Sequence, residues 1–279
     1  MERLEAHRYF YAELIAARAG KNERLREALA ATPRERFVGP GPWRVFAGGH
    51  YVETPTDDPA FLYQDVVVAL APEREINNGQ PVLHAINLAA LNVKQGEKVL
   101  HIGAGTGYYT AVLARLTGAT GAVVGYEIEE DLAGKAIQNL SDLANATVEH
   151  RSGTVGPLPV FDVIYVNAGA TAPLKVWLDA LEVRGRLLFP LTPPDGPAGM
   201  PGAGGMLLVT RSGGDRFDAR FVCPAMFVPC IGARDEETAQ KLSVAFKRGD
   251  MQKVKSLRRD SQPDETCWCA GDGWWLSNA

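Results

Sequence analysis

The 279-residue sequence has few cysteines, no strong excess of either charge and no long apolar run. None of its cysteines (Cys223, Cys230, Cys267 and Cys269) forms the Cys-x-x-Cys pair of a zinc site, so we expect reduced thiols and no metal. A formal charge of -4 argues against a large surface for nucleic acid or anionic membrane. No run could span a bilayer, and the charged N-terminus lacks a secretory apolar run. These absences favour a cytoplasmic protein with neither nucleic acid nor membrane as partner.

The middle of the chain alternates between short apolar runs and helical patterns. We expect strands at 98–103, 122–128, 146–153, 161–169 and 185–191, and helices at 108–118, 131–143 and 173–181. Strands that are apolar on both faces and separated by helices are typical of a parallel sheet covered on both sides. Two further strands within 206–223, joined at Gly213-Gly214, would end the sheet in antiparallel fashion. The sequence thus predicts an α/β fold with a doubly wound, mostly parallel sheet.

Less regular segments flank this core. Apolar residues recur at helical spacing within 1–31, and residues 81–93 also read as a helix. Residues 44–75 are expected to be loop-rich, and the proline- and glycine-rich stretch 193–205 is expected to be a loop. The aromatic end, 263–279, either packs on the main domain or forms a flexible tail.

A glycine-rich turn joins the first core strand to its helix. It reads Gly103-Ala104-Gly105-Thr106-Gly107. Glycine lets the backbone approach a ligand closely, and the free amides at a helix N-terminus favour negative charge. The turn therefore predicts a cradle for a nucleotide-like ligand, the alternative being a tight turn that binds nothing.

An acidic residue strengthens the prediction that the turn binds a nucleotide-like ligand. Glu127 ends the second strand about 20 residues after the turn, the spacing at which a carboxylate accepts hydrogen bonds from ribose hydroxyls. A surface acid that opens a helix is the alternative. A dinucleotide site prefers G-x-G-x-x-G, whereas here the third glycine comes one residue early. This order favours S-adenosylmethionine over NAD as the ligand.

Other motifs reveal a family resemblance. The stretches "TPRERFVG", "LYQD", "NNGQPVLHA" and "MFVPCIG", together with the run 161–191, follow one another as in protein-L-isoaspartate O-methyltransferases. Over roughly residues 1–232 the chain resembles this family. The resemblance implies a helical part at 1–95, a cofactor-binding core at 96–232 and a C-terminal extension at 233–279. It also implies methyl transfer from S-adenosylmethionine to a carboxylate of a protein or peptide.

The resemblance also assigns roles to individual residues. Glu127 would hold the ribose, and Ile128 would lie against the adenine. His84 would cover the cofactor, unless it is a histidine satisfied within its helix. The implied cofactor-binding residues are Gln80, His84, His101, Gly103, Ala104, Gly105, Gly107, Glu127, Ile128, Ser152 and Gly153, and the implied catalytic segment is Asn77, Asn78 and Gly79.

Three positions depart from the family pattern. Gly79 stands where the family has a serine beside the transferred methyl group, so that hydroxyl is absent. His101 replaces an acid that helps to receive the cofactor's ammonium, and Ser152 replaces an aspartate that accepts from adenine. These changes favour methyl transfer in general over isoaspartate repair. They leave open a biosynthetic peptide or small molecule as acceptor, or a binding module that has lost the donor.

Overall fold

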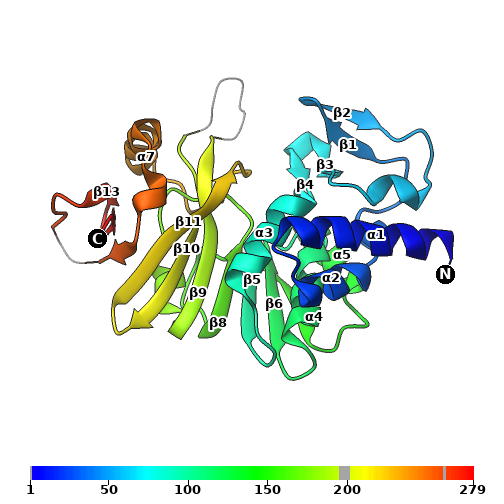
Figure 1. The fold of residues 1–279 in the computed structure, drawn as a ribbon, viewed down its shortest axis with the longest axis horizontal. Helices are drawn as coiled ribbons and strands as arrows, with labels where there is room; N and C mark the ends of the chain where they lie inside the picture. Colours follow the sequence, from blue (N-terminus) through cyan, green and yellow to red (C-terminus); the bar gives the residue numbers. More distant parts are fainter. Residues whose placement is uncertain (1, 195–201, 260–261) are drawn as a thin grey trace. The chain divides into compact units, whose positions relative to one another are not determined.

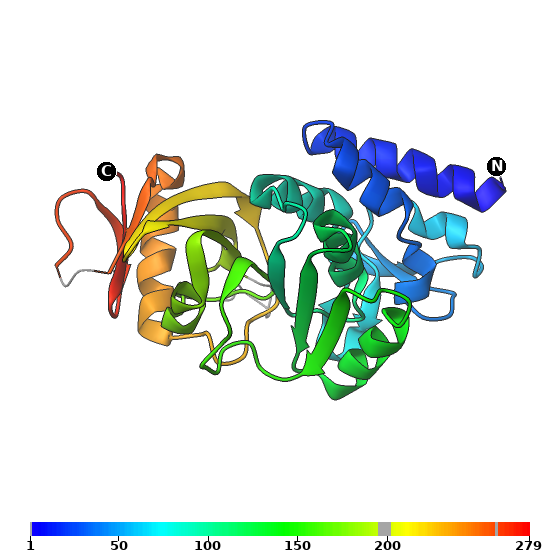
Figure 2. The same cartoon turned by 90° about the horizontal axis from the view of Figure 1, so that it is seen from below.

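The computed structural model describes residues 2–194, 202–259 and 262–279 (Figures 1 and 2). The chain divides into two compact units. The first comprises Met1–Lys98 and Ala104–Arg151, and the second comprises Val99–Gly103 and Ser152–Ala279. Among the described residues, no helix has the length and apolar character needed to cross a membrane.

The first unit begins with two helices in the region expected to be helical. Helix α1 (Arg3–Arg18) packs against α2 (Glu23–Ala30), and Tyr11, Ile15 and Leu25 are among the residues buried in this region. The Asn22 side chain caps α2 by accepting a hydrogen bond from the Leu25 amide at 3.1 Å. Helix α3 (Pro81–Leu91) follows later and confirms the helix expected at 81–93.

Residues 44–75 contain more regular structure than expected. Strands β1 (Arg44–Ala47) and β2 (His50–Glu53) form an antiparallel hairpin, and β3 (Ala69–Ala71) pairs with β4 (Ile76–Asn77). The sequence did contain a signal for the hairpin, because Gly48-Gly49 separates two short runs and a Gly-Gly pair is a typical two-residue hairpin loop. The 3-10 helices of the described residues include η1 (Arg34–Phe37), η2 (Pro59–Leu62), η3 (Pro72–Arg74) and η5 (Met251–Lys253).

The rest of the first unit follows the expected strand-and-helix alternation. Helix α4 (Tyr108–Thr117) is followed by β6 (Ala122–Glu127), α5 (Glu130–Asn139) and β7 (Ala146–His150). Strands β6 and β7 are parallel, as the alternation of strands and helices predicts.

In the second unit the strands form one continuous sheet, in the order β13-β14-β12-β11-β10-β9-β8-β5. Strands β5 (Lys98–Ile102), β8 (Phe161–Val166) and β9 (Leu181–Leu191) are parallel, and β10 (Gly204–Gly213) and β11 (Arg216–Ala225) continue in antiparallel fashion. The apolar residues of β8 are almost fully buried. The predicted α/β class with an antiparallel finish is confirmed. Helix α6 is short (Lys175–Asp179), and part of the loop expected at 193–205, residues 195–201, lies outside the described residues.

The C-terminal segment folds onto this sheet, which decides between the two alternatives for the aromatic end. Helix α7 (Glu236–Arg248) is followed by β12 (Ser256–Arg258), which pairs with β11, and by β13 (Cys267–Gly271) and β14 (Trp274–Ser277). Figures 1 and 2 show α7 beside these last strands. The ring of Trp268 packs edge-on against Phe221 and Phe246, at centroid distances of 5.3 and 5.2 Å. The end of the chain is therefore part of the core of the second unit.

Candidate functional site

The glycine turn has a backbone conformation that its glycines permit. Gly103, Gly105 and Gly107 have φ values of +76°, +55° and +94°, which residues with a Cβ adopt only at a cost. Gly107 is also the N-cap of α4, so the turn leads directly to the helix N-terminus. Glycine is needed at these positions for the backbone to turn in this way.

Within the first unit, the turn is tied to the acid at the end of β6. The Gly105 amide donates a hydrogen bond of 2.6 Å to Oε2 of Glu127. Oε1 of the same carboxylate accepts from the Glu129 amide at 3.0 Å, and the side chain is buried. Burial raises the pKa of Glu127 above its ordinary value, although these amide donors act in the opposite direction. A carboxylate has about four lone-pair sites, so capacity remains for hydroxyl donors from a ligand.

Ile128 follows this carboxylate directly in the chain. Its side chain is 39% exposed. An exposed aliphatic side chain next to the acid gives a flat ligand ring an apolar surface to contact. Ile128 therefore offers a suitable surface for adenine, and the contact itself stays a prediction.

The segment predicted to be catalytic is held by its own asparagines. Oδ1 of Asn77 accepts a hydrogen bond from the Gly79 amide at 2.9 Å. Oδ1 of Asn78 accepts from the Val68 amide at 2.7 Å, and Asn78 is nearly buried. Gln80 is fixed in a similar way, since its amide nitrogen donates to Asp65 at 2.9 Å. The side-chain oxygens of both asparagines thus bind backbone amides and hold the local backbone in place.

His84 lies against this segment. Its ring stacks on Tyr109, with the centroids 3.7 Å apart and the planes at 12°. Gly79 has φ +72°, and a Cβ built there would lie 2.8 Å from Cδ2 of His84 and still closer to Nε2. The imidazole therefore occupies the volume of the side chain that Gly79 lacks.

In the second unit, His101 is a neutral, buried side chain in β5. Burial lowers the pKa of His101 to about 3, because a charged imidazole would be desolvated there. The amide nitrogen of Asn167 lies 2.7 Å from Nε2 of His101, which suits donation to a neutral ring. His101 therefore brings no charge to the position where the family has an acid.

Ser152 and Gly153 are fixed by neighbours in the same unit. The hydroxyl of Ser152 is 2.8 Å from that of Thr154, and the carbonyl of Gly153 accepts from Nε1 of Trp177 at 2.7 Å. A Cβ at Gly153 would lie 2.6 Å from Ile102, so a larger residue does not fit.

Some residues that support these positions were not foreseen from the sequence. Tyr109 stacks on His84, Asn167 contacts His101, and Trp177 holds Gly153. Asn167 had a recognisable signal, because it directly follows β8 at the carboxyl end of a parallel strand, where ligands bind in such sheets. The other two contacts join residues distant in sequence, and no local pattern predicts them.

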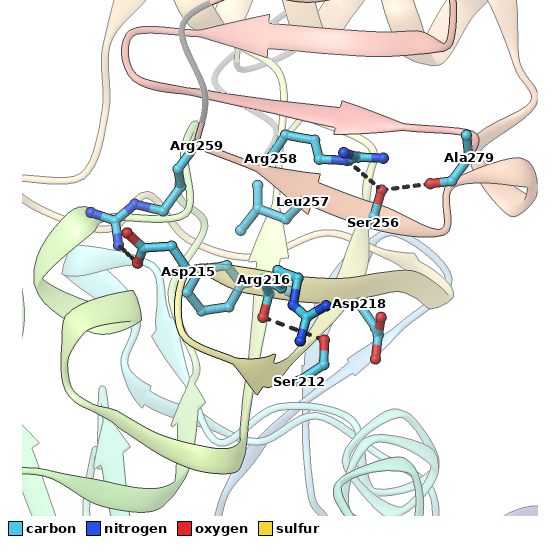
Figure 3. Close-up of a pocket in the computed structure, with 10 residues that line it drawn as sticks. Ser212, Asp215, Arg216, Asp218, Ser256, Leu257, Arg258, Arg259 and Ala279 are labelled. Carbon is cyan, nitrogen blue, oxygen red and sulfur yellow. Dashed lines mark hydrogen bonds and ion pairs between the residues drawn. The ribbon is translucent and has the colours of Figure 1, made fainter.

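A pocket in the second unit contains none of the predicted site residues. It has a volume of about 740 Å³ and lies along β11 and β12 (Figure 3). Its three arginines are Arg216, Arg258 and Arg259, and Arg259 pairs with Asp215 at 3.2 Å. The pocket also includes Asp218, so its charges are mixed and do not select for an anion or a cation.

Comparison with known proteins places this geometry in context. The sequence model of the protein-L-isoaspartate(D-aspartate) O-methyltransferase family matches residues 5–234. A protein-L-isoaspartate O-methyltransferase of Methylorubrum extorquens is 31% identical over 235 residues, covering 82% of this chain and 90% of the relative. Protein-L-isoaspartate O-methyltransferase 1 of Archaeoglobus fulgidus is 33% identical over 188 residues, covering 66% and 79% respectively.

Solved structures share the fold. A protein-L-isoaspartate O-methyltransferase superimposes with a TM-score of 0.64 at 22% identity, covering 86% of this chain and 69% of the other. A Plasmodium falciparum protein described as a putative member of the same class, crystallised with S-adenosyl-L-homocysteine, has a TM-score of 0.62 at 19% identity. This match covers 81% of the present chain and 98% of the Plasmodium falciparum chain. The α/β architecture is therefore that of this class of methyltransferase.

Proposed function

The chain belongs to the protein-L-isoaspartate(D-aspartate) O-methyltransferase family, and from this we infer that it is an S-adenosylmethionine-dependent methyltransferase acting on a carboxylate of a peptide or protein. The observation that carries the inference is the hydrogen bond between the Gly105 amide and the buried Glu127 carboxylate. It joins the glycine turn to the acid that such a cofactor requires.

The residues of the first unit fit the adenosyl part of this cofactor. Glu127 keeps acceptor capacity for two ribose hydroxyls, and Ile128 offers an exposed apolar side chain beside it. The turn between Gly103 and Gly107 has no side chain larger than that of Thr106, so a ligand can approach its backbone. We assign Gly103, Ala104, Gly105 and Gly107 to the methionine end.

S-adenosylmethionine supplies a methyl group on a positively charged sulfur, which a carboxylate can attack directly. A carboxylate is already ionised at neutral pH, so the protein needs no general base. Its residues have to orient the acceptor and exclude water. We assign orientation of the acceptor to the segment Asn77–Gly79 together with His84, which lies against Gly79.

The methyl acceptor has more than one candidate. Gly79 has no hydroxyl, and the neutral His101 cannot form an ion pair with the cofactor's ammonium. The missing hydroxyl at Gly79 favours another protein or peptide carboxylate over the isoaspartyl residue of damaged proteins, whereas His101 concerns only the cofactor. A biosynthetic peptide or a small molecule remains the second candidate, since the family serine is absent.

Methyl transfer to matched peptides tests the function. The chain is incubated with methyl-labelled S-adenosylmethionine and with two peptides that differ only in carrying an aspartyl or an isoaspartyl residue. We expect label on at least one of them as a base-labile methyl ester. Label on the isoaspartyl peptide alone would establish repair, whereas binding of S-adenosylhomocysteine without label on either peptide would reject both peptides as acceptors. No cofactor binding would leave only a non-catalytic module.

We also propose a cytoplasmic location. Reduced thiols persist in reducing compartments, and none of the four cysteines, which all lie in the described part of the chain, forms a disulfide. Fractionation of cells that express the full chain checks this location.

A further inference from the structure

The β1–β2 hairpin carries an aromatic pair on one face. Phe46 and Tyr51 are directly opposite each other in the register, and their rings meet edge-to-face with centroids 5.4 Å apart. Phe46 is 45% exposed. Because side chains alternate along a strand, Val45 and Val52 lie on the opposite face of the hairpin.

The hairpin is joined to the segment assigned to the acceptor through the backbone at Val67 and Val68. The Val67 carbonyl accepts a hydrogen bond from the Phe46 amide at 2.8 Å. The Val68 amide donates to Oδ1 of Asn78 at 2.7 Å, and the Asn78 amide donates to the Val68 carbonyl at 2.9 Å. Two adjacent residues therefore link the β1–β2 hairpin to Asn78.

The base of the hairpin is held firmly. The Trp43 amide donates to the Thr54 hydroxyl at 2.9 Å, and the Thr54 amide donates to the Trp43 carbonyl at 2.8 Å. The Trp43 ring is buried in a small apolar cluster with Leu62 and Val68. The Phe46 amide also donates to the Val67 carbonyl at 2.8 Å. The exposed ring of Phe46 is consequently presented by a fixed backbone.

We propose that the Phe46–Tyr51 face binds the peptide segment next to the carboxylate that is methylated, with an apolar side chain of that peptide lying on Phe46. The occupant follows from continuity, because the hairpin is joined through Val67 and Val68 to Asn78, which lies in the segment that orients the acceptor. An exposed aromatic ring on a rigid hairpin offers a large apolar contact at little entropic cost. This inference rests on the proposed function.

The test uses three variants and a defined peptide pool. The peptides contain aspartyl or isoaspartyl residues, each flanked by leucine, phenylalanine, serine or lysine. The variants are Phe46→Ala, Tyr51→Phe and, as a matched control, Val52→Ala, whose side chain is 44% exposed on the opposite face of the same hairpin. Transfer from labelled S-adenosylmethionine, affinity for S-adenosylhomocysteine and thermal unfolding are measured for each.

We expect the wild type to prefer peptides with leucine or phenylalanine beside the acid. Phe46→Ala should remove this preference through a roughly tenfold rise in KM for those peptides, with KM for the lysine-flanked peptides unchanged. Tyr51→Phe keeps the ring that packs on Phe46, so kcat, KM and the flanking preference should all stay close to those of the wild type. Val52→Ala should behave as the wild type, and all variants should bind S-adenosylhomocysteine equally.

Two outcomes would overturn the inference, and they are distinguishable. If the wild type labels peptides and Phe46→Ala has the same flanking preference as Val52→Ala, the hairpin is not an acceptor surface and the proposed function stands. If the wild type binds S-adenosylhomocysteine but labels no peptide, transfer to peptides itself is rejected, and the hairpin inference falls with it.

Discussion

The imidazole of His84 fills the space that a side chain at position 79 would need. Gly79 has a left-handed backbone, and a Cβ there would overlap the His84 ring. The ring cannot easily yield, because it is stacked on Tyr109. Gly79, where the family resemblance places a serine, thus packs directly against an imidazole.

This relationship predicts that Gly79→Ala destabilises the protein more than an equivalent change elsewhere. Gly48 also has a positive φ but faces open space, so Gly48→Ala should cost only the backbone strain, about 1–2 kcal/mol. Gly79→Ala should cost a further ~1–3 kcal/mol because of the overlap. Denaturant unfolding measures both free energies. Equal losses would show that the ring moves aside. In the His84→Ala background, Gly79→Ala should cost only the backbone strain, because the overlap is gone.

Glu127 should govern cofactor affinity. Glu127→Gln removes the charge that strengthens hydrogen bonds from ribose hydroxyls, so S-adenosylhomocysteine should bind on the order of 10- to 100-fold more weakly. Burial raises the pKa of Glu127. As the pH is lowered, the affinity of the wild type for S-adenosylhomocysteine should therefore begin to fall at a higher pH than it would if Glu127 had the pKa of an ordinary glutamate. Calorimetry checks both effects. Glu130→Gln, an exposed change in the first turn of α5, is the control, and equal losses in the two variants would contradict this role.

His101 predicts a pH dependence of stability. Its pKa is lowered to about 3 in the folded protein, whereas an unfolded histidine titrates near 6.5. As the pH falls from about 6.5 toward 3, the unfolded chain takes up a proton that the folded protein refuses, so stability is lost in this window and is complete above it. His101→Asn should flatten this dependence by up to about 1.4 kcal/mol per pH unit. Identical slopes for the two proteins would show that His101 protonates within the fold.

The C-terminal segment should be integral to the second unit. Trp268 is 2% exposed and packs on Phe221 and Phe246, so Trp268→Ala should cost about 3–5 kcal/mol of unfolding free energy. Val244→Ala on the exposed face of α7 should cost far less, since Val244 is 66% exposed. A loss below 1 kcal/mol for Trp268→Ala would instead indicate a loosely attached tail.

The core strands and the glycine turn were predictable because each depends on a local pattern. Continuous apolar runs mark β5, β8 and β9, and the G-A-G-T-G order marks the turn. The strands of the C-terminal segment were not predicted, because β12 is only three residues long and becomes a strand by pairing with β11. Short strands of this kind depend on a tertiary partner that the local sequence does not specify.

The candidate site likewise combines features that the sequence predicts with features that it does not. Residue types and spacing place Glu127 and the turn at the same end of the strands, but they do not predict the hydrogen bond from the Gly105 amide to the Glu127 carboxylate. Nor do they predict the engagement of Asn77 and Asn78 with the backbone, since an amide side chain can equally serve a ligand. The contact between Gly79 and His84 depends on a positive φ, which the sequence permits but does not require.

The central claim is that the glycine turn and Glu127 hold the adenosyl cofactor. Calorimetric titration of the full chain with S-adenosylhomocysteine tests it most directly. We predict saturable binding of one ligand per chain, weakened by Glu127→Gln and unchanged by Glu130→Gln. The absence of any heat of binding from correctly folded wild type would contradict the claim.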